Sequence, residues 1–170
     1  IYGYGLSHET VNSPNYTEIP LKLDVYYPDN SDGNRPAYLF IHGGGFISGD
    51  KQDGFLSEIA KYYASRGWVF ISINYRLQDD LGTVPQEWLD FANNQPTAAR
   101  GQIIAQYPAM RDAKASIRWL AANATTYGVN MDFLTVGGGS AGAITAISTS
   151  LSNEEDFRDE LDMNQDPSLG

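Results

Sequence analysis

Residues 133–147 read Phe-Leu-Thr-Val-Gly-Gly-Gly-Ser-Ala-Gly-Ala-Ile-Thr-Ala-Ile, and this segment is the most informative about the fold. An apolar run precedes the glycine cluster and an Ala/Ile-rich run follows it, which predicts a strand, a sharp turn and a helix. Ser140 lies in the turn between Gly138 and Gly142. A turn this tight strains the serine backbone, exposes its hydroxyl and requires very small flanking residues. The stretch predicts an exposed serine nucleophile, although ordinary and phosphate-binding turns can share the pattern.

A second strand that runs into glycines lies upstream, where residues 37–46 read Ala-Tyr-Leu-Phe-Ile-His-Gly-Gly-Gly-Phe. Consecutive glycines let the backbone pass close to a ligand and point its amide groups at it. The amides of Gly44 and Gly45, with that of Ala141, are candidates to hold the oxyanion of a tetrahedral intermediate. Such a donor contributes about 3–4 kcal/mol to lowering the barrier. A plain glycine-rich turn is the weaker interpretation, because chance rarely supplies both motifs in this order.

Together the motifs resemble the N-terminal half of an α/β-hydrolase of the carboxylesterase and lipase kind with a His-Gly-Gly-Gly oxyanion motif. The resemblance implies an α/β fold with a mostly parallel sheet flanked by helices. It implies that Ser140 is the nucleophile, that Gly44, Gly45 and Ala141 supply oxyanion amides, and that His42 is a structural residue of the oxyanion loop. The matching segments are Leu-Asp-Val-Tyr-Tyr-Pro (23–28), His-Gly-Gly-Gly-Phe (42–46), Gly-Asp-Lys (49–51), Asn-Tyr-Arg-Leu (74–77), Asp-Ala-x-x-Ser-x-Arg-Trp-Leu (112–120) and Gly-Gly-Ser-Ala-Gly (138–142).

No histidine follows Ser140 in this sequence. A serine hydroxyl needs a base, and in this fold the triad runs in the order Ser, then Asp or Glu, then His. The two histidines are His8, which we expect at the surface, and His42. Several carboxylates follow the serine in an acidic stretch, but none is selected as the triad acid: Asp156, Asp159, Asp162 and Asp166.

The strand that ends at Val136 shows no alternating polar face, so we expect it to be buried on both sides with further strands beside it. Residues 1–170 are therefore expected to be the N-terminal part of one catalytic domain. The remaining strands, the acid and the histidine would lie on a second chain or on a part of the protein beyond Gly170.

Composition and charge restrict the partners and cofactors that this protein is expected to bind. The hydrophobic fraction of 42% is typical of a globular protein, and the net charge of −10 argues against nucleic acid or anionic membranes as partners. We expect no membrane span, no metal and no cofactor, because there is no long apolar run and no ligand-spaced His/Cys/carboxylate cluster. The start at Ile1 rather than Met favours a removed leader, and hence a secreted or periplasmic location.

Hydrophobic spacing predicts the other elements and a parallel sheet with right-handed crossovers, which places Ser140 at the carboxyl end of its strand. Asp112 is expected to be structural and to pair with a nearby loop. The expected elements are a surface arm (1–16), a half-exposed strand (17–28), buried strands (37–41 and 68–73), an amphipathic helix (54–66) and a helix opened by Pro108 (108–127).

Residues 78–101 fit no regular element, and long irregular loops are often functional. Trp88 or Phe91 is a candidate to line the substrate pocket, although the favoured alternative is that both residues anchor the loop to the body. Phe46, next to the glycines of the second motif, is the better placed pocket candidate.

The sequence thus favours a serine carboxylic-ester hydrolase that acts on a small-molecule ester through an acyl-enzyme on Ser140. The segment 42–51 also resembles feruloyl and acetyl-xylan esterases, so polysaccharide esters and generic short-chain esters are both candidate substrates. Two alternatives stay open: an amide or peptide hydrolase of the same fold, and a non-catalytic binding protein that kept the fold.

Overall fold

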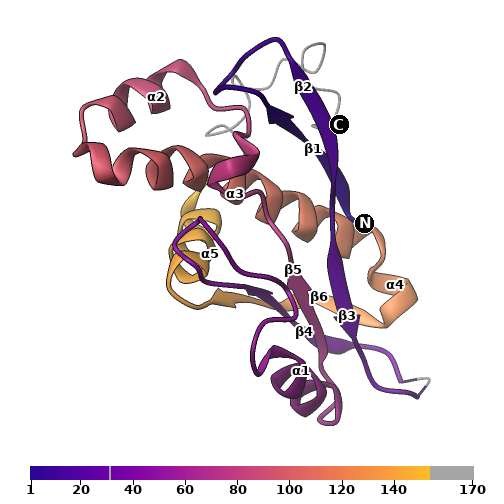
Figure 1. Cartoon of the computed structure of the whole chain (residues 1–170). Helices are drawn as coiled ribbons and strands as arrows, with labels where there is room; N and C mark the ends of the chain where they lie inside the picture. Colours follow the sequence, from indigo (N-terminus) through magenta and orange to yellow (C-terminus); the bar gives the residue numbers. More distant parts are fainter. Residues whose placement is uncertain (31, 154–170) are drawn as a thin grey trace.

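The computed structural model describes residues 1–30 and 32–153, and its central layer is a four-stranded sheet in the order β3-β5-β4-β6 (Figure 1). The strand β4 (Arg35–Ile41) lies between β5 (Val69–Ile73) and β6 (Val129–Gly138) and is parallel to both. Only β3 (Leu23–Tyr26), at the edge, runs antiparallel to its neighbour. The prediction of an α/β fold with a mostly parallel sheet is confirmed.

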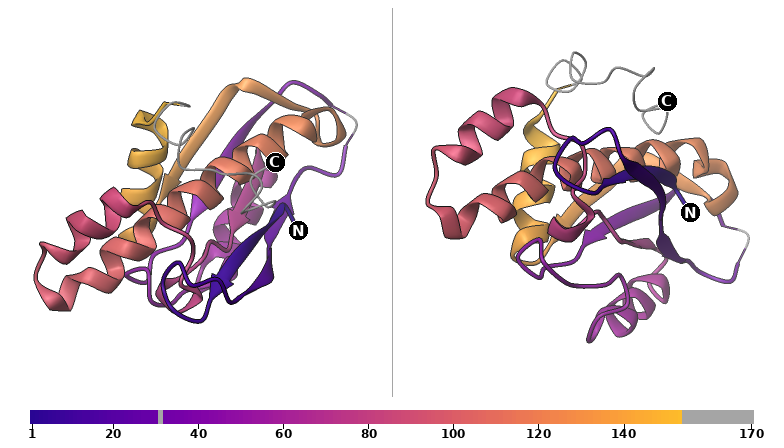
Figure 2. Two further views of the ribbon diagram at one scale, coloured as in Figure 1. Left: turned by 90° about the horizontal axis from the view of Figure 1, so that it is seen from above. Right: turned by 45° about the horizontal axis from the view of Figure 1, so that its top comes forward.

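Helices cover both faces of this sheet (Figure 2). The helix α1 (Leu56–Ala64) packs on one face, while α3 (Thr97–Ala122) and α5 (Ala141–Leu151) lie together on the other, and the short α4 (Ala124–Tyr127) leads into β6. No helix in the described part of the chain is long and apolar enough to cross a bilayer.

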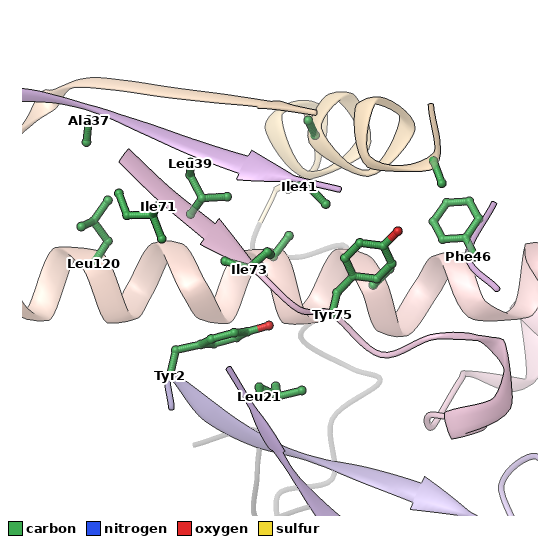
Figure 3. Packing of buried hydrophobic residues seen from close by; sticks show 14 of the residues in the cluster. Tyr2, Leu21, Ala37, Leu39, Ile41, Phe46, Ile71, Ile73, Tyr75 and Leu120 are labelled. Atoms are coloured by element: carbon green, nitrogen blue, oxygen red, sulfur yellow. The ribbon is translucent and has the colours of Figure 1, made fainter. Parts of the chain in front are cut away.

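The main core lies between the sheet and α3 (Figure 3). Side chains of β4 alternate, so that Ala37, Leu39 and Ile41 are fully buried while the residues between them are half-buried. All five residues of β5 are buried, the polar Ser72 included, which confirms the prediction of a buried strand at 68–73. On α3, alanines spaced by four residues (Ala105, Ala109 and Ala113) form a narrow strip that lets the helix approach the strands closely.

The N-terminal region differs from its prediction. The expected arm and single strand are instead a hairpin of β1 (Gly3–His8) and β2 (Tyr16–Leu21), and the chain then bends at Lys22 into β3. Gly5 lowers the strand propensity of this segment, so the sequence does not predict a strand there. Tertiary packing nevertheless requires a glycine at this position. A Cβ on Gly5 would lie only 2.7 Å from the Arg76 side chain. His8 is not on the surface but buried, with its ring nitrogens bonded to the Ser13 carbonyl and the Thr83 hydroxyl.

The region 78–101 is largely helical rather than irregular. It contains the 3-10 turn η1 (Gln78–Asp80), the helix α2 (Gln86–Asn93) and the start of α3 at Thr97. The predicted helix start at Pro108 is wrong, because this proline lies inside α3 and is fully buried. A proline inside a helix removes a hydrogen bond, but here its ring packs so closely on Gly82 that a Cβ there would lie 2.7 Å away.

The expected structural pairing of Asp112 is confirmed. Its carboxylate forms a buried ion pair with the Arg76 guanidinium, at 2.7 Å, and also accepts a hydrogen bond from the Arg76 backbone amide at 2.8 Å. Arg76 donates further to the Leu6 carbonyl at 3.1 Å. One buried pair therefore joins α3, the segment after β5 and the N-terminal hairpin.

The expectation that β6 is buried on both sides requires strands from outside the described residues, and it stays a prediction. Within residues 1–30 and 32–153, β6 pairs only with β4, and its other edge has no neighbour. Phe133 on this strand is 59% exposed. The surface of α5 is also apolar, since Ile144, Ile147 and Leu151 are all exposed. The four carboxylates that follow the serine lie outside the described residues: Asp156, Asp159, Asp162 and Asp166.

Candidate active site

The register of two neighbouring strands brings the two glycine motifs together. In the parallel pair of β4 and β6, Ile41 stands opposite Gly138, so both strands end at the same level. The Gly139 amide donates to the Ile41 carbonyl at 3.3 Å across this junction. Residues about a hundred positions apart in the sequence thus meet at the carboxyl end of the sheet, where α/β folds place their ligands.

Ser140 occupies the turn between β6 and α5 with φ 51° and ψ −118°. This left-handed backbone is strained for any residue with a side chain. The serine is exposed, and its carbonyl accepts hydrogen bonds from the amides of Ala143 and Ile144, at 2.9 and 3.1 Å, which start the helix. The local conformation is the one that the sequence pattern predicts.

Gly138 and Gly142 have no room for side chains. A Cβ on Gly138 would lie 2.4 Å from the Ile41 carbonyl oxygen and 2.6 Å from the Gly142 carbonyl carbon. A Cβ on Gly142 would lie 2.0 Å from the Ile41 oxygen and 2.5 Å from that of His42. The predicted collision across the turn is confirmed for Gly138, which would meet Gly142. The backbone of the neighbouring strand β4 is a second obstacle, for both glycines, that the sequence pattern does not reveal.

The loop after β4 curls through three consecutive left-handed residues, with φ 111° at Gly44, 64° at Gly45 and 63° at Phe46. The Gly44 carbonyl accepts hydrogen bonds from the amides of Ile47 and Ser48. The Phe46 carbonyl accepts one from the backbone amide of Gln78. Two glycines make the first part of this curl possible, but Phe46 is a strained residue that the sequence does not reveal.

Three amide groups at this junction remain available to a ligand. Those of Gly44 and Gly45 donate no hydrogen bond to any described residue, and that of Ala141 stands at the first position of α5 without an intrahelical acceptor. Gly43 lies directly against the turn, since a Cβ there would be 3.4 Å from that of Ser140. The geometry thus brings together the residues predicted as nucleophile and oxyanion donors.

His42 supports this loop and does not contact the serine. Its ring is buried, stacks on Tyr75 at 4.4 Å between centroids, and has Nδ1 2.7 Å from the Gly43 carbonyl oxygen, to which it donates. The Tyr75 hydroxyl donates to the His42 carbonyl at 3.0 Å. Burial lowers the pKa of His42, and this outweighs the opposing effects of the Gly43 carbonyl and of nearby Asp53 and Asp50. The ring is neutral at pH 7.

A polar cluster holds the far side of the loop. The Asn74 side chain donates to the Asp50 carboxylate at 2.7 Å and accepts from the Lys51 amide at 2.5 Å, while the Lys51 ammonium pairs with Asp24 at 2.9 Å. Burial raises the pKa of Asp50, but hydrogen bonds from Asn74 and the Gln52 amide and the charges of Lys51 and His42 outweigh it and leave that pKa below its usual value. The segments 49–51 and 74–77, which support the sequence resemblance, therefore fix the loop.

A pocket of about 300 Å³ opens beside the serine. It includes Phe46, as predicted, but not Trp88. The Trp88 indole N–H donates to the Ile103 carbonyl at 2.7 Å and its ring packs on Tyr107, so it anchors α2 to α3. The pocket is lined by Gly45, Phe46, Ala99, Gln102, Ile103, Gln106, Ser140, Ala141 and Ile144.

The described residues bring no general base to Ser140. His8 is held between Ser13 and Thr83, and His42 is fixed in its stack. The described part of the chain also contains no group of three His, Cys, Asp or Glu side chains that could bind a metal.

Comparisons with known proteins point to carboxylic-ester hydrolases. A family model described as BD-FAE matches residues 23–93 and 100–169. Pyrethroid hydrolase Ces2a of Mus musculus is 31% identical over 78% of this chain and 21% of its own length. Para-nitrobenzyl esterase of Bacillus subtilis is 29% identical over 78% of this chain and 26% of its own.

Among solved structures, the propionate-bound esterase Est2 of Thermogutta terrifontis superimposes with a TM-score of 0.58 at 27% identity. The match covers 90% of this chain and 48% of Est2. The chain therefore spans about half of that enzyme and about a quarter of the curated relatives it matches.

Proposed function

Because this chain belongs to the BD-FAE family of α/β-hydrolase carboxylesterases, we propose that it carries the nucleophile and the oxyanion loop of a serine carboxylic-ester hydrolase. The observation that carries the proposal is the β4–β6 register. It joins an exposed, strained serine to a left-handed loop with free amide groups.

In the proposed reaction the Ser140 hydroxyl attacks the ester carbonyl and its proton passes to a histidine base. The amides of Gly44, Gly45 and Ala141 hold the resulting oxyanion, in positions that need no rearrangement during the reaction. Collapse of the intermediate expels the alcohol, which takes the proton, and leaves an acyl-enzyme on the serine. Water, deprotonated by the same histidine, then releases the acid.

The histidine and its acid partner are proposed to lie outside residues 1–170. The sequence has no histidine after the serine, and both of its histidines have other partners. This chain also covers only about half of Est2, which leaves a comparable length of chain to supply the missing strands and the two catalytic groups.

Short-chain esters are the proposed substrates, with feruloyl and acetyl esters of polysaccharides as the other class. Solved structures of Est2 hold propionate and butyrate, and another shows that enzyme phosphorylated by paraoxon, a modification typical of an activated nucleophile. The pocket of about 300 Å³ is at the small end of the range for ligand sites, which suits a short acyl group.

A fluorophosphonate probe tests the proposal directly in the full protein that contains this chain. We expect one label per molecule, found by peptide mass analysis on Ser140, and loss of both the label and ester hydrolysis in a Ser140→Ala variant. The matched control is Ser148→Ala, eight positions along α5, which should change neither. An unlabelled serine in a folded protein that hydrolyses no ester would instead support the non-catalytic alternative.

A further inference from the structure

One face of α3 forms a wall of the pocket next to Ser140. The four α3 residues that line it are Ala99, Gln102, Ile103 and Gln106. Their spacing of i, i+3, i+4 and i+7 places them in one stripe along the helix. This face belongs to the first half of α3, which the sequence does not predict to be helical, so its contribution to the site becomes visible only in the fold.

The two glutamines are the only polar side chains in this wall. Both are half-buried, and neither side-chain amide has a hydrogen-bond partner among the described residues. The Gln102 amide also reaches the proposed oxyanion loop, because its Nε2 lies 3.1 Å from where a Cβ on Gly45 would stand. Each carboxamide offers two donors and one acceptor oxygen toward the pocket.

The remainder of the lining is mostly apolar. Phe46 comes from the glycine loop, Ala141 and Ile144 from α5, and Ile103 lies between the two glutamines on α3. Ligand sites commonly combine apolar walls with a few polar groups that fix orientation. Two amides without a protein partner, in a mostly apolar pocket that also contains Ser140, have the arrangement by which such sites fix a ligand's orientation.

We propose that Gln102 and Gln106 select esters whose pocket-filling group carries a hydroxyl, in preference to the matching plain alkyl esters. This inference rests on the proposed esterase function. Half-buried amides without a protein partner can hydrogen-bond to solvent, and a ligand that fills the pocket would exclude that solvent. A hydroxyl replaces the lost hydrogen bonds, whereas a plain alkyl group leaves the amides unpaired, which is unfavourable.

The size of the effect follows from the partial burial of the amides. Fully buried polar sites reject analogues that lack a hydroxyl by very large factors, but half-buried groups keep part of their solvent contact. We expect the full protein to hydrolyse the hydroxylated ester with a kcat/KM about tenfold higher than that for its plain partner.

Matched substrates test the proposal. The acyl pair is 4-nitrophenyl butyrate and 4-nitrophenyl 3-hydroxybutyrate, and the alcohol pair is propyl acetate and 2-hydroxypropyl acetate. These are measured with the full protein and with Gln102→Leu, Gln106→Leu and the double variant. The control is Gln86→Leu on the exposed start of α2, whose side chain bonds Asp90 and not the pocket.

The expected result is a preference for the hydroxylated member of one pair that falls to near unity in the double variant, while Gln86→Leu keeps it. A preference ratio equal in all variants, or no preference in either pair, overturns the inference and leaves the esterase proposal intact. Absence of both fluorophosphonate labelling and hydrolysis of all four esters overturns the proposed function and this inference with it. Thermal unfolding of each variant verifies that a changed ratio does not come from a damaged fold.

Discussion

Individual residues at the turn have sharply different tolerance for a side chain. Gly142 would place a Cβ 2.0 Å from the Ile41 oxygen, whereas a Cβ on Gly139, in the same turn, would meet nothing within 4 Å. We expect Gly142→Ala to lower the free energy of unfolding by at least about 2–3 kcal/mol, because backbone must move to relieve the overlap. Gly139→Ala should change it by less than about 1 kcal/mol. Urea unfolding of the two variants makes the comparison, and equal losses would contradict the close approach of β4.

The backbone of Ser140 is strained, and glycine would relieve that strain. A left-handed residue with a side chain costs about 1–3 kcal/mol, and the extra freedom of glycine in the unfolded chain offsets part of this gain. Ser140→Gly is therefore expected to be about 1 kcal/mol more stable than Ser140→Ala. Neither variant should be labelled by the probe. If the alanine variant proved the more stable, the strain would not exist in the native protein.

His42 should make stability depend on pH. Burial lowers its pKa below the 6.5 of a free histidine, so between the two values the unfolded chain holds a proton that the folded chain lacks. Its contribution to stability is complete above about pH 6.5 and is lost as the pH falls toward the folded pKa. Urea unfolding between pH 7.5 and pH 5 should therefore show a smaller decline in His42→Gln than in the unmodified protein. Parallel pH curves for the two would exclude this role.

At the scale of elements, the buried pair of Arg76 and Asp112 joins three parts of the fold. Asp112→Ala would leave a buried guanidinium without its carboxylate, at a cost of about 3–5 kcal/mol. The double variant Arg76→Met/Asp112→Leu should lose less, because no charge remains buried.

A surface pair provides the comparison for this prediction. Glu58 and Lys61 on α1 are both well exposed, so Glu58→Gln should change the free energy of unfolding by less than about 1 kcal/mol. Chemical denaturation gives the free energy of unfolding of each variant. If Asp112→Ala lowered it as little as Glu58→Gln does, the structural role of the Arg76–Asp112 pair would be refuted.

The sequence predicts the elements that carry a clear period and misses those defined by tertiary contacts. The runs 37–41 and 68–73 are predicted as strands and form β4 and β5. The two glycine motifs predict the loop after β4 and the serine turn after β6, which together form the candidate site. The predicted strand 17–28 becomes β2 and β3, but β1 is missed because its glycines and polar residues have low strand propensity. The start of α3 is missed because Pro108 normally opens a helix, and only packing against Gly82 explains its place inside one. The pocket wall on α3 is missed for the same reason.

At the scale of the whole molecule, the apolar surface of β6 and α5 should make residues 1–170 self-associate when they are produced alone. Exposed apolar faces and unpaired strand edges favour such contacts. Ile147→Lys with Leu151→Lys should shift the isolated chain toward monomer in light-scattering measurements. Tyr62→Lys, a matched exposed residue on α1, should not. A monomeric unmodified chain would contradict the prediction, and with it the proposal that further strands cover this face.

The position of β4 between β5 and β6 also implies an order of events during synthesis, because β5 follows β4 in the chain well before β6 does. At about 5–20 residues per second, β5 follows β4 within a few seconds, but β6 emerges only after about 5–20 seconds. One edge of β4 can therefore pair with β5 early, whereas the edge that will pair with β6 stays unpaired and exposed to solvent for longer. Ser140 reaches the glycine loop last of all, so the proposed site cannot assemble in a nascent chain until nearly all of these residues have left the ribosome.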